Sequence, residues 1–163
     1  MHFIEPLESG TWFRTIDSLS HRSRRSAGDL EEQLRHAYHL AQMAPLPIRE
    51  VVQPKCDEVR FEQFLACGAF ESAALALIPA PLKYSVARGY DTMVLATVAL
   101  PGDDTGNFAS AEEFASALLQ AWVRSVMALQ PQSAGGLFPE GAAETDADWP
   151  WAQMDGFRRS ARP

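Results

Sequence analysis

Residues 71 to 101 read ESAALALIPAPLKYSVARGYDTMVLATVALP, and this stretch decides the fold. Its first seven residues are rich in alanine and leucine and stop before Pro79, which cannot continue a helix, so they predict a short helix. Tyr84 and Val86 then alternate with polar neighbours, and residues 93 to 100 form an almost continuous β-prone run. A turn containing glycine separates the two runs. We therefore predict an antiparallel hairpin whose second strand is central and buried on both faces.

Two further helices are predicted before this stretch, at residues 28 to 44 and 57 to 68. The first has acidic residues in its opening turn and apolar residues at helical spacing, and the second opens on an aspartate and closes on a glycine. Between them, residues 45 to 54 contain three prolines, which favour an extended connection with a short edge strand at residues 48 to 52. Residues 12 to 16 predict either a short strand or a helical turn.

A long helix is predicted to follow a capping box made by Ser110 and Glu113, and to end near Gln130. Two apolar stripes run along this helix and leave only a narrow polar ridge. Such a wide apolar surface exceeds what packing on one sheet requires. The helix is therefore either deeply buried or also forms an oligomer interface, for which the candidate residues are Leu119, Val123 and Met127.

The segment before that helix, residues 102 to 107 (GDDTGN), is polar. Its two aspartates, with Thr105 and Asn107, supply oxygen ligands of the kind that calcium binds. An EF-hand loop also needs alternating ligands, a central glycine and a terminal glutamate in a twelve-residue frame, and that frame is missing. We interpret the segment as an Asx-type turn.

These elements place the chain in the α+β class, with a small antiparallel sheet packed by helices in an α/β/α sandwich-like arrangement. A length of 163 residues suffices for one self-supporting domain, which we place at residues 1 to 131, with residues 71 to 130 as its recognisable core. Residues 132 to 163 form a linker and an irregular tail with aromatic and acidic residues. This tail either folds back over the domain or orders on a partner protein through Trp149, Trp151 and Phe157.

The charge balance limits the possible partners. The chain carries 21 acidic and 14 basic residues, a net charge of -7, which argues against direct binding to nucleic acid unless the basic residues cluster. The one cluster, residues 21 to 25 (HRSRR), is interpreted as a solvated loop or as a contact to an acidic partner through Arg22, Arg24 and Arg25. Residues 1 to 10 do not resemble a signal peptide, and no run reaches the ~18 apolar residues of a membrane span. We expect a soluble protein in a bacterial cytosol that does not contact a membrane.

The central stretch, together with the alanine-rich helix after Ser110, resembles the phage ABA sandwich domain. The matching positions in the central stretch are Ala73, Ala74, Leu75, Leu77, Pro79, Tyr84 and Val86. Tyr84 stands where the family usually has a tryptophan, and residues 1 to 55 show no likeness to the family. The resemblance covers residues 70 to 130 and implies an α/β sandwich and a phage or prophage origin. It implies no established activity, because the shared pattern is one of packing.

Catalytic signatures are missing from the chain, which has no GxSxG, Walker loop, HExxH or paired CxxC motif. His36 and His39 lie one helical turn apart near Glu32, but no third strong metal ligand is near, so we interpret them as surface or partly buried histidines. Cys56 or Cys67 could pair with either histidine as nucleophile and base, yet no local motif supports this, and we interpret both as reduced thiols. We expect no enzyme activity, no cofactor and no metal.

The function that these observations favour is protein binding. We expect a small acidic phage or prophage accessory protein, for example an anti-CRISPR-like inhibitor whose acidic surface occupies the nucleic-acid channel of a host defence complex. Such a DNA mimic would carry its carboxylates in a ridge on one face. The alternative is a homo-oligomeric structural or accessory phage protein, such as a homodimer, without an inhibitory role. A third possibility is a small hydrolase or metal protein.

Overall fold

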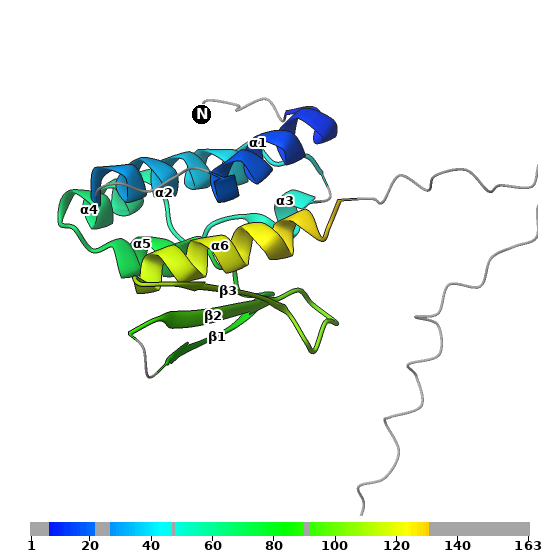
Figure 1. Cartoon of the computed structure of the whole chain (residues 1–163). Coiled ribbons are helices and arrows are strands. Elements are labelled where there is room, and N and C mark those ends of the chain that lie inside the picture. Colours follow the sequence, from blue (N-terminus) through cyan, green and yellow to red (C-terminus); the bar gives the residue numbers. More distant parts are fainter. Residues whose placement is uncertain (1–6, 22–26, 47, 90–91, 131–163) are drawn as a thin grey trace, which may run out of the picture. The chain divides into compact units, whose positions relative to one another are not determined.

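The computed structural model describes residues 7–21, 27–46, 48–89 and 92–130, which form six helices and one three-stranded sheet (Figure 1). All of them belong to one compact unit, Met1–Pro131. The elements in chain order are α1 (Ser9–His21), α2 (Ala27–Gln42), α3 (Ile48–Val52), α4 (Glu58–Ala66), α5 (Phe70–Ala76), β1 (Lys83–Arg88), β2 (Val94–Ala99), β3 (Asn107–Ala111) and α6 (Phe114–Met127).

The sheet is antiparallel with the order β1-β2-β3, so the predicted hairpin and the central position of its second strand are confirmed. Val94, Ala96 and Val98 point toward the helices and are buried. Side chains alternate between the two faces of a strand. The opposite face of β2 carries Leu95, which is 44% exposed. The prediction that this strand is buried on both faces is therefore wrong, because the helices that the structure describes cover only one of them.

The described helices all lie on the same side of the sheet (Figure 1). Helices α5 and α6 form the layer next to the strands, and α1, α2 and α4 form a second layer beyond them. The α+β class with an antiparallel sheet packed by helices is confirmed. The layers run sheet, helix, helix, which differs from an α/β/α sandwich, where helices cover both faces.

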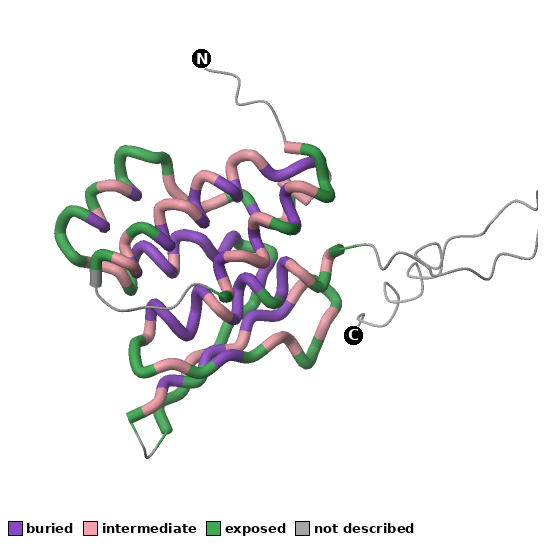
Figure 2. The backbone as a smooth tube through the Cα atoms, turned by 45° about the horizontal axis from the view of Figure 1, so that its top comes forward, coloured by how far each residue is buried: buried purple, intermediate pink, exposed green. Residues whose placement is uncertain are grey.

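Helix α6 is the centre of the core, because it contacts β2 and β3 of the sheet, α5 in its own layer and α1 in the second layer. Figure 2 shows buried positions along α6 and along the facing sides of α1 and α2. Of the two alternatives for its wide apolar surface, deep burial is the one observed. Leu119 and Val123 are buried inside the domain and Met127 is partly buried against the same core, so these residues do not form an exposed oligomer interface.

The first two helices are joined by a buried tryptophan. Trp12 is fully buried, and its indole N–H donates to the carbonyl of Leu40 on α2 at 2.7 Å. This bond satisfies a polar atom that would otherwise destabilise the core. Residues 12 to 16 are helical, which decides between the strand and the helical turn left open by the sequence.

Two local predictions were wrong. Residues 48 to 52 form helix α3 rather than an edge strand. Prolines before a helix are compatible with it, since the first turn needs no N–H donors of its own, and the carbonyl of Pro45 accepts from the N–H of Arg49 at 3.0 Å. The capping box is also wrong, because Ser110 belongs to β3 and pairs with Leu95, while α6 begins later with Glu113 as its N-cap residue.

Candidate functional site

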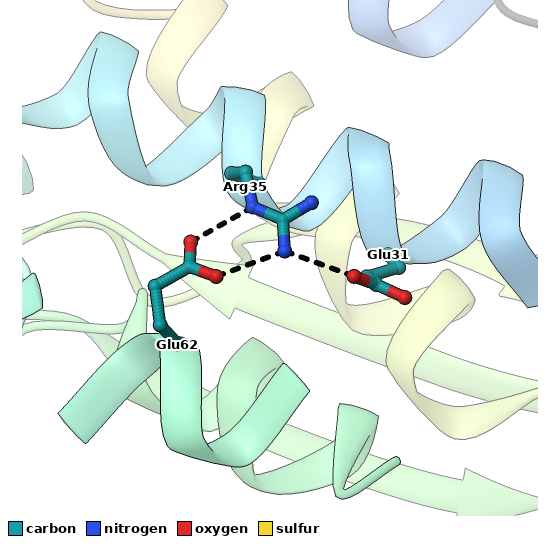
Figure 3. Close-up of polar contacts among 3 residues, drawn as sticks. All are labelled: Glu31, Arg35 and Glu62. Carbon is teal, nitrogen blue, oxygen red and sulfur yellow. Dashed lines mark hydrogen bonds and ion pairs between the residues drawn. The ribbon is translucent and has the colours of Figure 1, made fainter. Parts of the chain in front are cut away.

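Helices α2 and α4 are connected by a polar group of three residues (Figure 3). Arg35 donates from Nε and Nη2 to the two carboxylate oxygens of Glu62, each at 2.8 Å, and from Nη2 to Glu31 at 2.9 Å. The hydrogen bond from Arg35 lowers the pKa of Glu62, and the same carboxylates raise the pKa of Arg35. One guanidinium holds two carboxylates, Glu31 on the same helix and Glu62 on α4, so the group links α2 to α4.

Cys56, just before α4, is half-buried and poorly suited to act as a nucleophile. Burial raises the pKa of its thiol, with a further contribution from Asp57. The thiolate is the reactive form, so a raised pKa lowers reactivity at neutral pH. The carbonyl of Cys56 accepts a hydrogen bond from the Tyr38 hydroxyl at 3.0 Å, and the Tyr38 ring stacks on Phe61. His39 packs edge-on against the same tyrosine ring.

The metal hypothesis gains no support from the geometry. Within the described ranges, no group of three His, Cys, Asp or Glu side chains is placed to hold a metal ion. His36, His39 and Glu32 share α2 but do not form such a group.

The turn predicted at residues 102 to 107 was the second candidate for binding a metal ion. Oδ1 of Asp103 accepts from the N–H and the hydroxyl of Thr105 at 2.9 and 2.8 Å, which is the geometry of an Asx turn. The Asx interpretation of this segment is therefore confirmed. The same bonds lower the pKa of Asp103, so its carboxylate stabilises the loop.

Two open depressions lie at the ends of the sheet. The larger, about 560 Å3, lies between the end of β1 and the start of α6, and its lining includes Arg88 with Glu71, Glu112 and Glu113. The smaller, about 350 Å3, lies between the start of β1 and the aspartate turn, and its lining includes Lys83, Asp103 and Asp104. Neither is lined by a cysteine or a histidine, so neither joins a thiol to an imidazole.

The most distinctive surface is the face of the sheet that the described helices leave uncovered. We call it the outer sheet face, and its members are Lys83, Ser85, Ala87, Leu95, Thr97, Ala99, Phe108 and Ser110. Thr97 pairs with Phe108 and Leu95 pairs with Ser110, so Leu95 and Phe108 are diagonal neighbours on this face. They are 44% and 63% exposed. The three strands contain no acidic residue.

Of the residues singled out from the sequence, the three that the structure describes do not lie at this surface. Leu119, Val123 and Met127 pack in the core. Arg22, Arg24, Arg25, Trp149, Trp151 and Phe157 lie outside the described residues. Sequence reasoning missed Leu95 because the strand within residues 93 to 100 was predicted to be buried on both faces, and it missed Phe108 because no strand was predicted at that position. The alternation of Leu95 and Thr97 with smaller buried residues was the signal for a one-sided strand.

Comparison of the chain with protein-family models, with curated proteins and with solved structures found no match. The resemblance of residues 70 to 130 to the phage ABA sandwich domain therefore stays a prediction. No helix among residues 7–21, 27–46, 48–89 and 92–130 has the length and apolar character to cross a membrane.

Proposed function

We propose that this protein acts by binding another protein through the outer sheet face. The observation that carries the proposal is the pair Leu95 and Phe108, two large apolar side chains that lie side by side on a face without covering helices. Single exposed apolar residues are common on soluble proteins, whereas neighbouring ones on an uncovered sheet are typical of interaction surfaces.

The chemistry of the face favours an apolar partner surface with hydrogen-bonding groups around it. Leu95 and Phe108 supply the apolar centre, and the hydroxyl groups of Ser85, Thr97 and Ser110 surround it. Complete burial of a leucine or phenylalanine side chain is worth about 1.5–3 kcal/mol. Because both side chains are already partly covered, contact with a partner would add about 2–3 kcal/mol for the pair. This is a substantial fraction of a micromolar affinity, which corresponds to about 8 kcal/mol.

The narrower version of the proposal is a phage or prophage protein that inhibits a host defence complex in the bacterial cytosol. Its support is the resemblance in residues 70 to 130. Acidic residues of the described chain lie on or directly before helices α1 through α5 and in the turns beside β3, while the strands have none. This distribution favours contact through the apolar sheet face over imitation of a DNA backbone, for which a ridge of carboxylates would be required.

A comparative pull-down tests the proposal. Tagged wild-type protein, the double variant Leu95→Thr/Phe108→Ser and the control Val59→Ser would each be incubated with bacterial lysate. Val59 is 70% exposed on α4, far in sequence from the sheet, so it controls for the loss of exposed apolar surface. We expect at least one protein to be retained by the wild type and the control and lost by the double variant. Retention of the same proteins by all three, or of none by any, would refute the proposed surface.

A further inference from the structure

The two edges of the sheet differ in how their backbone groups are used. The N–H of Gly89 donates to the carbonyl of Met93 at 2.8 Å, which identifies these residues as a hydrogen-bonded pair of the β1–β2 hairpin. Hydrogen-bonded and non-bonded pairs alternate along an antiparallel ladder. The backbone groups of Lys83, Ser85 and Ala87 therefore point toward β2, and those of Tyr84, Val86 and Arg88 point away from the sheet.

The same alternation can be checked at the other edge. Backbone groups of β2 that do not bond to β1 point toward β3, and the register then directs the backbone groups of Phe108 away from the sheet. The structure agrees, because Arg124 of α6 donates from Nη1 to the carbonyl of Phe108 at 2.5 Å. A side chain from the domain itself thus occupies part of the β3 edge. Covering an edge in this way is one means by which proteins prevent pairing with another chain.

At the β1 edge, none of the described residues provides such a cover. No hydrogen bond from any described residue reaches the outward groups of Tyr84, Val86 or Arg88. The strand has six residues, contains no proline, and pairs with β2 without interruption over its whole length. Its side chains are mostly exposed, and Tyr84 is 47% exposed. A regular open edge of this kind is a template for another strand.

We propose that β1 pairs with β1 of a second copy of this chain, antiparallel about a two-fold axis through Val86, to form a continuous six-stranded sheet. Two-fold pairing can be centred on Ser85, Val86 or Ala87. Only the arrangement centred on Val86 pairs all three outward-pointing residues of one strand with those of the other. Each flanking arrangement leaves one outward residue of each strand without its partner, so it forms fewer hydrogen bonds.

The side chains favour the same arrangement. Centred on Val86, each Tyr84 lies opposite Arg88 of the second copy on the same face of the sheet, where a guanidinium can stack on the tyrosine ring. Val86 meets its own copy, which adds a contact between β-branched side chains. Lys83 lies opposite Gly89, so no two cations face each other across the axis. The two outer sheet faces then form one surface, which presents two copies of the Leu95 and Phe108 pair.

The first test is the mass of the full chain by light scattering at roughly 100 µM, well above the concentration range in which a weak dimer dissociates. We expect twice the 18.0 kDa of one chain. The variant Val86→Pro removes an outward N–H but leaves the bonds to β2 in place, so it should return the mass to that of a monomer. Circular dichroism checks that this variant is folded. A monomeric wild type, or a folded Val86→Pro variant that stays dimeric, would overturn the proposal.

A cross-linking experiment tests the register without relying on the proline variant. In a background with Cys56→Ser and Cys67→Ser, Val86→Cys should form a disulfide-linked dimer on mild oxidation, because directly paired residues have Cα atoms about 5.5 Å apart. Ser85→Cys is the matched control, because in this register Ser85 of one chain lies opposite Ala87 of the second copy, so the two cysteines are not directly paired. More cross-linking at position 85 than at position 86 would reject the register. Arg88→Glu should weaken the dimer about tenfold by removing both stacking contacts.

The proposed dimer and the proposed partner-binding surface can be tested independently of each other. Leu95→Thr/Phe108→Ser changes the outer sheet face and leaves the outward groups of β1 intact. Its mass should therefore equal that of the wild type even though it loses its bound protein. A change in mass for this variant would show that the second copy occupies the sheet face instead of the edge, which overturns the edge proposal.

Discussion

Replacement of Gly106 by alanine should destabilise the domain much more than the same replacement at Gly102, although both glycines lie in the loop between β2 and β3. Both have a positive φ, +65° for Gly106 and +85° for Gly102. A Cβ on Gly106 would lie 2.9 Å from the Val98 carbonyl and 2.9 Å from Cγ2 of Thr97, whereas a Cβ on Gly102 would meet nothing within 4 Å. Both variants therefore have the backbone strain of a positive φ, but only the Cβ at position 106 collides with β2.

The expected difference can be estimated from these contacts. An alanine in the left-handed region costs about 1–2 kcal/mol at either position. Overpacking against a rigid neighbour adds about 1–3 kcal/mol, and one of the neighbours of Gly106 is backbone, which cannot move aside. The loss of unfolded-state freedom on replacing glycine stabilises both variants alike, so it cancels in the comparison. We expect Gly106→Ala to lower the free energy of unfolding by about 2–5 kcal/mol and Gly102→Ala by about 1–2 kcal/mol.

Equilibrium unfolding in urea, followed by far-ultraviolet circular dichroism, would measure both values. Gly68→Ala is a second control, because Gly68 has φ +69° at the end of α4 and also has open space around its missing Cβ. If all three variants lose the same stability within about 0.5 kcal/mol, the loop does not press against β2 and the reasoning is wrong.

Three further predictions concern other contacts. Ser125→Ala removes a buried hydroxyl that donates to the Val98 carbonyl at 2.6 Å, and should cost about 1 kcal/mol in urea unfolding. Asp57→Ala removes the side chain that accepts from the N–H of Arg60 at the start of α4 and should cost about 1 kcal/mol, while Asp57→Asn should cost less. The pKa of Glu62 is lowered in the folded state, so its stabilising contribution is present above its unfolded pKa and is lost as pH falls through the folded pKa. The stability of the wild type should therefore fall more steeply than that of Glu62→Gln as the pH is lowered below roughly 5.

Each of these has a distinct failing result. An unchanged unfolding midpoint for Ser125→Ala would mean that water replaces the hydroxyl. Equal losses for the alanine and asparagine variants of Asp57 would show that its side chain does not cap the helix. Parallel pH profiles for the wild type and Glu62→Gln would show that the pair with Arg35 is too exposed to matter, since exposed ion pairs contribute only about 0–1 kcal/mol.

The elements with strong local signals were predictable from the sequence. Residues 71 to 77 and 93 to 100 were recognised from composition and proline position, and they correspond to α5 and β2 within one or two residues. Strand β3 was missed because its five residues are held in place by pairing with β2, and this pairing leaves no pattern within the five residues themselves. The local pattern there, Ser110 with Glu113, indicated a helix start, and the tertiary pairing overrode it.

The candidate site was less predictable than the fold. Its two apolar members come from β2 and β3, so they become neighbours only when the register of the sheet is known. In the sequence, Leu95 looked like a core residue, and Phe108 followed a polar turn with no sign of a strand. The edge of β1 likewise has no sequence signature, because the direction of its backbone groups depends on its pairing with β2.

The burial of α6 has a consequence for how the chain folds during its synthesis on the ribosome. Trp12 and Ile16 of α1 pack in a core that Phe114–Met127 completes, although roughly a hundred residues separate the two helices along the chain. At a synthesis rate of about 5–20 residues per second, the first helices wait on the order of 5–20 s for their packing partner. During that interval their apolar side chains are exposed, and a product that ends before α6 would be a substrate for chaperones and proteases rather than a smaller folded domain.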